Sequence, residues 1–250
     1  MPSIFHEPVI QLAVAVQGRS QSKFAQAPND LVRDALFALT HDAVCVHRAI
    51  GTLVDAGWSG PGAALLRALI DLNVSTLAVV NSVNPRMAAF RYLYSGLRRH
   101  SRDQSFSSTQ RKLIFAQIRK RIHMLPAELR GEALSVIRER DRPYWFSEEF
   151  KSPTDVLDRF GAPGMVWAYL QVSAAAHGSM IGLRLFRDDP DRIDINPQPF
   201  GPKALALDIS SCRFLTSLLE LRDAYERLGM AAQIRATVEP IREAGLKGVA

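Results

Sequence analysis

Cysteine is scarce in this sequence, and the familiar catalytic and nucleotide-binding motifs are missing from it. The two cysteines, Cys45 and Cys212, are too few for a disulfide framework in a chain of 250 residues, and they do not form a CxxC pair. No P-loop, GxGxxG, GxSxG or HExxH pattern occurs. These absences argue against a disulfide-stapled secreted domain and against the common nucleotide-dependent and hydrolase classes.

Long uninterrupted apolar runs and strand-like alternation are missing as well. The run VIQLAVAV follows Glu7 without a basic segment before it and is too short to cross a bilayer. The longest apolar region, LLRALIDLNVSTLAVV, contains Arg67, Asp71 and Asn73, which is typical of a core helix. We therefore expect no membrane segment and a cytoplasmic location. No stretch alternates with period two for long enough to predict a strand.

Helical periodicity is what the sequence does have. After the cap signal Asn29/Asp30, apolar residues recur every three or four positions up to Gly57, and an almost wholly apolar helix follows from Pro61. A last long helix has a similar stripe and stops at Gly229. The first stripe is Val32, Leu36, Leu39, Ala43, Val46, Ile50 and Leu53, and the last is Ala204, Leu207, Ser211, Phe214, Leu218, Leu221, Tyr225 and Leu228.

The predicted fold is all-α, a single-domain antiparallel helical bundle with long helices, because the connections are mostly short. The expected parts are an N-terminal arm at 1–30, the helical bundle domain at 31–230 and a polar C-terminal tail at 231–250. One connection is long: the Pro/Asp-rich loop RDDPDRIDINPQPFGP follows a helix expected from Pro163 to Phe186. A loop of this length inside a domain is uncommon and often functional.

In the stretch SAAAHGSM, residues 173–180, a hydroxyl and an imidazole stand among very small side chains. On a helix, Tyr169, Ser173 and His177 share one face at spacings of four. Beside them runs a strip of minimal side chains formed by Ala174, Gly178 and Gly182. Because glycine inside a helix costs about 1 kcal/mol relative to alanine, this strip indicates the close approach of another helix.

The helix that we expect against this strip is the apolar one that begins at Pro61. Arg67 and Asp71 lie four apart on it. Because the basic residue comes first, an ion pair between them would stabilise an exposed helix only weakly. Buried charges must be paired and hydrogen-bonded. We therefore predict a polar cluster between the two helices, made of Arg67, Asp71, Tyr169, Ser173 and His177.

Two stretches resemble the signatures of a bacterial domain-of-unknown-function family. GTLVDAGWSGPGAALLRALIDLN is similar to that family's helix, Gly turn and Arg-x-x-x-Glu helix, and YLQVSAAAHGSM is similar to its Ser-x-x-x-His signature; PYWF resembles the tryptophan that precedes the second signature. The resemblance covers about residues 31–186. It marks as site residues Arg67, Asp71, Trp145, Ser173 and His177. Asp71 stands where the family has Glu, which shortens the reach of the acid.

That family is similar to HEPN-type helical bundles, a superfamily with many RNA-cleaving toxins and defence nucleases that are often dimeric. The resemblance implies a HEPN-like homo-oligomer in a bacterial defence or toxin–antitoxin setting. Those nucleases carry Arg, four to six residues and then His on one helix. This chain departs from the pattern, because three residues separate Arg119 from His123 and seven separate Arg33 from His41.

Positive charge is concentrated in the middle third of the chain. Between Arg86 and Arg142 there are 14 Lys and Arg against 5 Asp and Glu, a net charge of +9, whereas the whole chain has +6. Guanidinium groups suit phosphate oxygens. The candidate phosphate-binding residues are Arg98, Arg99, Arg119, Lys120 and Arg121. The alternative is a solvated helix face, since aromatic residues are too sparse there for a stacking platform.

Two functions stay open at this point. One is a non-catalytic partner-binding or sensor module in which the polar cluster is a buried structural network. The other is a metal-independent ribonuclease in which His177 acts as general acid or base, Arg67 faces the phosphate, and Ser173 or Tyr169 positions the substrate. RNA and a protein are the candidate partners, and no membrane is expected to be one.

Neither a cofactor nor a metal ion is expected from the sequence. His41 and Cys45 share a helix face at a spacing of four, but His47 lies on the opposite side of that helix and no third ligand is visible nearby. Both cysteines are therefore interpreted as ordinary packed or partly packed thiols.

Overall fold

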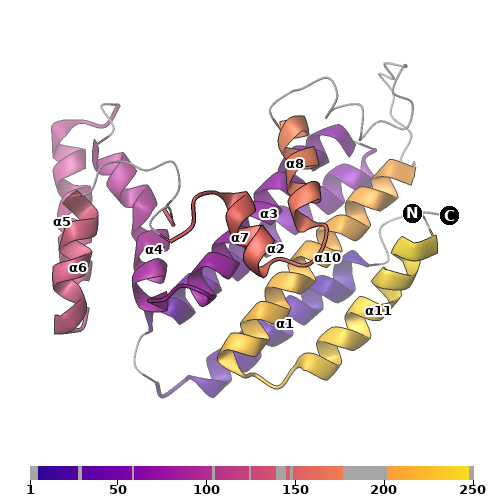
Figure 1. Cartoon of the computed structure of the whole chain (residues 1–250), viewed down its shortest axis with the longest axis horizontal. Helices are drawn as coiled ribbons and strands as arrows, with labels where there is room; N and C mark the ends of the chain where they lie inside the picture. The colour runs from indigo at the N-terminus through magenta and orange to yellow at the C-terminus, as the bar shows by residue number, and fades with distance from the viewer. Residues whose placement is uncertain are drawn as a thin grey trace.

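The computed structural model describes residues 5–27, 30–57, 59–102, 105–123, 125–138, 145–146, 149–176 and 202–247. Within these ranges the chain forms ten helices and no strand, which confirms the all-α prediction (Figure 1). The helices are α1 (His6–Lys23), α2 (Leu31–Asp55), α3 (Ser59–Val80), α4 (Pro85–Arg102), α5 (Ser108–His123), α6 (Ala127–Arg138), α7 (Pro153–Phe160), α8 (Met165–Ala176), α10 (Pro202–Glu226) and α11 (Ala231–Lys247).

Several helix ends lie where the cap signals predict them. The Asp30 side chain accepts a hydrogen bond from the Val32 amide at 2.9 Å and caps α2, and Ser152 does the same for the Asp155 amide at 3.1 Å before α7. Gly57, after α2, and Gly229, after α10, have φ of 80° and 77°. Because L side chains rarely adopt such angles, glycine at these two positions ends the helices at low cost.

Helix α3 is the centre of the main core, as its apolar composition predicts. It packs against α2, α10, α8, α4 and α7. Pro61–Val80 has the length and apolar character of a membrane span, but 61% of that stretch is buried inside the fold. Its one buried amide, Asn73, donates to the backbone oxygen of Phe214 on α10 at 2.9 Å. The apolar surface of α3 is thus largely covered by neighbouring helices.

Helices α1 and α11 lie against α10, in the segments expected as an arm and a tail (Figure 1). Both contribute to the main core, α1 through Val9, Leu12 and Val16, and α11 through Ile234 and Ile241. Helix α1 runs in the same direction as α10, because its first residue approaches the start of α10 and its last turn approaches the end of α10. Neighbouring helices of the core are therefore not all antiparallel.

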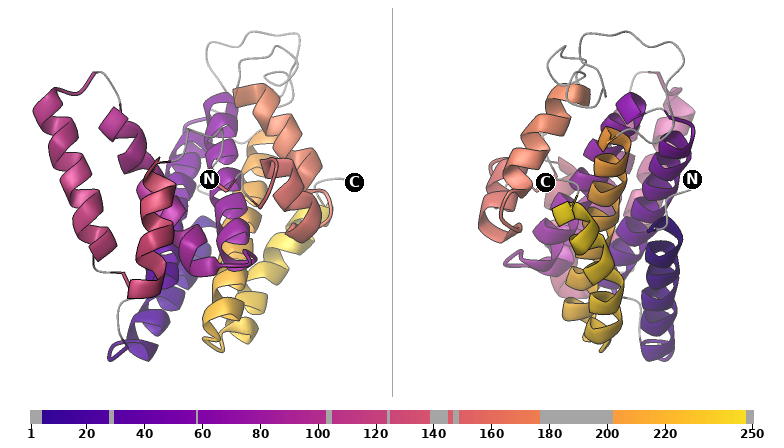
Figure 2. Two further views of the ribbon diagram at one scale, coloured as in Figure 1. Left: turned by 60° about the vertical axis from the view of Figure 1, so that its left-hand side comes forward. Right: turned by 90° about the vertical axis from the view of Figure 1, so that its right-hand side faces the viewer.

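Helices α4, α5 and α6 extend to one side of the main core (Figures 1 and 2). They enclose a second apolar cluster of their own, which comprises Met87, Phe90, Ile118, Ile122, Leu125, Leu129 and Ala133. A smaller cluster connects α4 to α2 and the end of α3. The basic middle third of the sequence is thus a separate layer of helices, referred to below as the α4–α6 arm.

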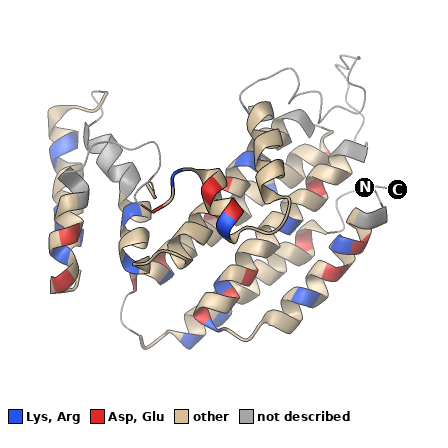
Figure 3. Ribbon diagram, in the orientation of Figure 1, with Lys and Arg blue, Asp and Glu red and all other residues tan. Residues whose placement is uncertain are grey.

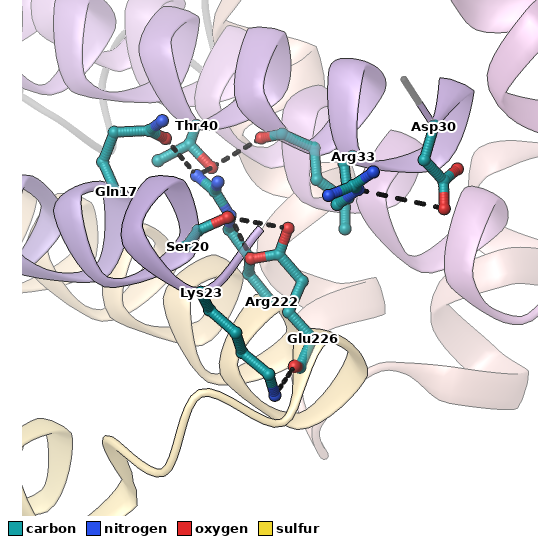
Figure 4. Close-up of polar contacts among 9 residues, drawn as sticks. Gln17, Ser20, Lys23, Asp30, Arg33, Thr40, Arg222 and Glu226 are labelled. Carbon is teal, nitrogen blue, oxygen red and sulfur yellow. Dashed lines mark hydrogen bonds and ion pairs between the residues drawn. The ribbon is translucent and has the colours of Figure 1, made fainter. Parts of the chain in front are cut away.

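A buried ion pair joins α10 to α1 and α2 (Figure 4). The Arg222 side chain is 1% exposed; its Nε donates to Glu226 Oε2 at 3.0 Å, and its Nη1 donates to Gln17 at 2.6 Å and Thr40 at 3.0 Å. Ser20 donates to the other oxygen of Glu226 at 3.1 Å. The guanidinium and the carboxylate are therefore paired with each other and with both neighbouring helices, as buried charges require.

Removing one member of this pair is expected to destabilise the fold strongly. Arg222→Met leaves the Glu226 carboxylate buried without its cation, so the free energy of unfolding, measured by urea denaturation, should fall by about 3–5 kcal/mol. Arg222→Met/Glu226→Leu removes both charges and should recover much of that loss. The matched control is Arg235→Met at an exposed arginine of α11, expected within about 0.5 kcal/mol of wild type. Equal losses of unfolding free energy in Arg222→Met and Arg235→Met would contradict this account.

Candidate functional site

Three of the five residues predicted to form a polar cluster meet between α3 and α8. Arg67 Nε donates to both carboxylate oxygens of Asp71, at 3.2 and 3.1 Å, and its Nη2 donates to the Tyr169 hydroxyl. The guanidinium carbon also lies 3.8 Å from the centroid of the Tyr169 ring. Helices α3 and α8 therefore meet at Arg67, through its hydrogen bond to Tyr169 and its stacking on the Tyr169 ring.

The electrostatics of this group favour a structural pairing. Burial raises the pKa of Asp71 above its usual value, and the neighbouring Arg67 opposes that shift. Tyr169 is buried in the main core, whereas about half of the Asp71 side chain is exposed. Arg67 thus has an ion-pair partner on its own helix and a stacked aromatic ring on the next one.

Of the other two predicted members, the structure describes Ser173 and not His177. Ser173 lies on α8, one turn beyond Tyr169, and is half-buried. His177 lies outside the described residues, as do Gly178, Gly182 and the Pro/Asp-rich loop. The contact of the imidazole with Arg67 therefore stays a prediction.

Trp145, marked by the family resemblance, packs between the core and the α4–α6 arm. Its ring meets Tyr92 of α4 edge to face, with 5.7 Å between the ring centroids, and also contacts Phe146. Trp145 is partly buried against the main core and against α4, so its ring has a packing role.

The predicted phosphate-binding residues all belong to the α4–α6 arm. Arg98 and Arg99 belong to α4, and Arg119, Lys120 and Arg121 are exposed on α5, where the Arg119 guanidinium lies 5.0 Å from the Phe115 ring centroid. In Figure 3 the charged residues of α5 are all basic, whereas α6 beside it has acidic as well as basic residues. A mixed surface of this kind is also what a solvated helix face presents.

A cleft of about 560 Å³ opens where the α4–α6 arm meets the ends of α2 and α10. Its charged lining comprises three arginines and three acids, namely Arg33, Arg86, Arg121, Asp30, Asp34 and Glu226; Tyr94 and Tyr225 lie beside them. Burial and the neighbouring Asp30 raise the pKa of Asp34. The sequence placed Arg121 among the candidates but gave no sign of the cleft, because its walls come from four separate stretches of the chain, 24–34, 86–94, 121–129 and 225–226.

A second polar group, which sequence reasoning missed, lies between α1, α2 and the first half of α10. We call it the histidine–cysteine cluster: His6, His47, Asp208, Ser211 and Cys212. His6 Nδ1 lies 2.6 Å from His47 Nε2, His47 Nδ1 lies 2.8 Å from Ser211 Oγ, and His6 Nε2 lies 3.5 Å from Asp208 Oδ1. One ligand atom from each of His6, His47 and Cys212 lies within 4.8 Å of the others.

Burial governs the protonation of this cluster. His47, Ser211 and Cys212 are fully buried. Burial and then the neighbouring His6 lower the pKa of His47 to about 3, so its imidazole is neutral. Burial, together with the Asp208 carboxylate, raises the pKa of the Cys212 thiol. One sequence signal was available: Ser211 stands within the apolar stripe of α10, where a hydroxyl needs a buried partner.

His41 and Cys45 are exposed on α2, with Cys45 Sγ 3.9 Å from His41 Nε2. Within the described part of the chain, this pair belongs to no group of three or more possible metal ligands.

Comparison with family models, with curated proteins and with solved structures gives no match for this chain.

The Arg67–Tyr169 contact makes a prediction about stability. Tyr169→Phe removes the hydroxyl that accepts from Arg67 and should lower the free energy of unfolding by about 1–3 kcal/mol. Tyr169→Leu also removes the stacked ring and should cost about 1 kcal/mol more. Thermal and urea denaturation measure both effects, with Tyr225→Phe at a partly exposed tyrosine as the control. Equal losses for Phe and Leu would show that the stacking contributes nothing.

Proposed function

We propose that this protein is a non-catalytic partner-binding or sensor module with a HEPN-like helical bundle. The bacterial defence or toxin–antitoxin setting, and the expected homo-oligomer, enter this proposal through the family resemblance of the sequence. The main support from the structure is the pairing and stacking of the Arg67 guanidinium.

The Arg67 guanidinium is occupied by its own neighbours. Three hydrogen bonds, two to Asp71 and one to Tyr169, and a stacked ring hold it in place. A cation that stabilises a transition state must instead face the reacting phosphate. The paired and stacked arginine therefore supports a structural network over a catalytic centre.

The cleft beside the α4–α6 arm supplies a place for a partner. It lies between two separately packed cores, and its lining offers hydrogen-bond donors, acceptors and aromatic edges. A group bound there would contact α2, α4, α5 and α10 at once. Binding would then bias how the arm sits against the main core, which is what a sensor requires.

The alternative is the metal-independent ribonuclease that uses His177 and Arg67. It requires His177 to lie near a phosphate that Arg67 also contacts. The exposed arginines and lysine of α5, residues 119–121, are the surface that would hold the RNA backbone.

An RNA-cleavage assay separates the two functions. We expect purified wild-type protein and His177→Ala to show equal, negligible cleavage of labelled tRNA and total RNA, because the cluster is structural. The same substitution should lower the melting temperature, whereas His41→Ala, at an exposed histidine of α2, should leave it unchanged. RNA cleavage by wild type that is lost in His177→Ala, and kept in His41→Ala, would establish the ribonuclease instead.

A further inference from the structure

The histidine–cysteine cluster brings three metal-binding side chains together from three helices. His6 begins α1, His47 lies on α2, and Cys212 lies on α10, one turn after Asp208. We propose that His6, His47 and Cys212 bind a borderline-soft divalent transition metal ion of the Zn²⁺ class, with Ser211 as the hydrogen-bond partner of His47 and with the Asp208 carboxylate facing His6 at ion-pair distance. This inference is independent of the proposed function.

The donor set defines the class of ion. Two imidazole nitrogens and one thiolate sulfur suit Zn²⁺ and its neighbours, whereas Mg²⁺ and Ca²⁺ require oxygen ligands. Binding releases the thiol proton of Cys212, because a coordinating thiol is a thiolate. The two positive charges of the ion are then balanced by the thiolate and by the Asp208 carboxylate. A buried site with no net charge avoids most of the cost of an isolated ion.

The second nitrogen of each imidazole has a partner of the kind that metal-bound histidines use. His47 Nδ1 lies 2.8 Å from Ser211 Oγ, which leaves Nε2 facing His6. His6 Nε2 lies 3.5 Å from Asp208 Oδ1, which leaves Nδ1 facing His47. Metal-ligating histidines almost always have a hydrogen-bond partner, which fixes the tautomer and the ring orientation. Ser211 is such a partner for His47, and the Asp208 carboxylate lies at ion-pair distance from His6. The two nitrogens that face each other are therefore the ones assigned to the ion.

The required rearrangement is small. The facing nitrogens lie 2.6 Å apart, whereas two nitrogens on a tetrahedral Zn²⁺ lie about 3.3 Å apart, so the rings must separate by about 0.7 Å. His6 is the first residue of α1, where its backbone is least constrained by the helix. Its ring is seated on Gly51 of α2, where an added Cβ would collide with the imidazole. Glycine inside a long helix thus provides the space that the ligand occupies.

A hydrogen-bonded chain from His6 through His47 to Ser211, with Asp208 as an ion-pair partner of His6, is the alternative use of the same residues. That chain gives no role to the Cys212 thiol. Thiolate coordination is therefore the property that separates the two interpretations, and cobalt substitution detects it directly, because a thiolate bound to Co²⁺ gives an intense near-ultraviolet charge-transfer band.

The test uses the untagged, full-length chain after dialysis against a chelator. We expect wild type to bind one Zn²⁺ per chain, to melt at a higher temperature when Zn²⁺ is present, and to show the thiolate band with Co²⁺. His6→Ala and Cys212→Ser should each lower Zn²⁺ affinity more than about 100-fold, and Ser211→Ala by about 10–100-fold. Gly51→Ala should weaken binding too, because the added methyl displaces the His6 ring.

The matched control is His41→Ala/Cys45→Ser, which removes an exposed histidine and an exposed cysteine from α2. This variant should keep the bound Zn²⁺ and the cobalt band of wild type. Absence of Zn²⁺ binding in wild type, equal binding by His6→Ala, or loss of binding only in the control would each overturn the proposal. His6 lies at the edge of the fold, with 13% of its side chain exposed, so His6→Ala decides the matter even if Cys212→Ser does not fold.

Discussion

The packing of this protein depends on pairing the polar groups that α10 buries against α1 and α2. The Arg222–Glu226 ion pair binds Gln17 and Ser20 of α1 and Thr40 of α2 near the end of α10. The histidine–cysteine cluster joins the same three helices near the beginning of α10. An unpaired buried charge costs several kcal/mol. These two points of contact therefore determine where α1 lies along α10, which apolar packing alone specifies loosely.

Polar side chains have different roles in other parts of the molecule. The Arg67 group pairs α3 with α8, and its guanidinium is hydrogen-bonded and stacked there. The cleft beside the α4–α6 arm is different, because its lining surrounds a space of about 560 Å³, although one of its acids, Glu226, is already paired with Arg222. The histidine–cysteine cluster is different again, since we propose that its imidazoles and thiol also bind a metal ion. Structural pairing is thus observed at Arg67, and partner binding and ion binding are proposed for two other places.

Sequence reasoning predicted local features well. Asp30, Gly57 and Gly229 indicated helix ends because capping is a property of a few adjacent residues. The contact of Arg67 with Tyr169 was predictable as well, because two polar residues on very apolar helices need each other. The histidine–cysteine cluster was not, since His6, His47 and Cys212 come from three distant helices. No local pattern shows that α1 runs parallel to α10.

Hydrogen exchange of α1 in the native protein tests the central claim most directly. A peripheral helix that is docked by apolar contacts alone opens locally and exchanges quickly. If buried polar pairs at both ends hold α1 on α10, the amides of residues 10–20 should be protected to about the same degree as those in the middle of α2. Fast exchange throughout α1, while α2 and α10 stay protected, would contradict the account.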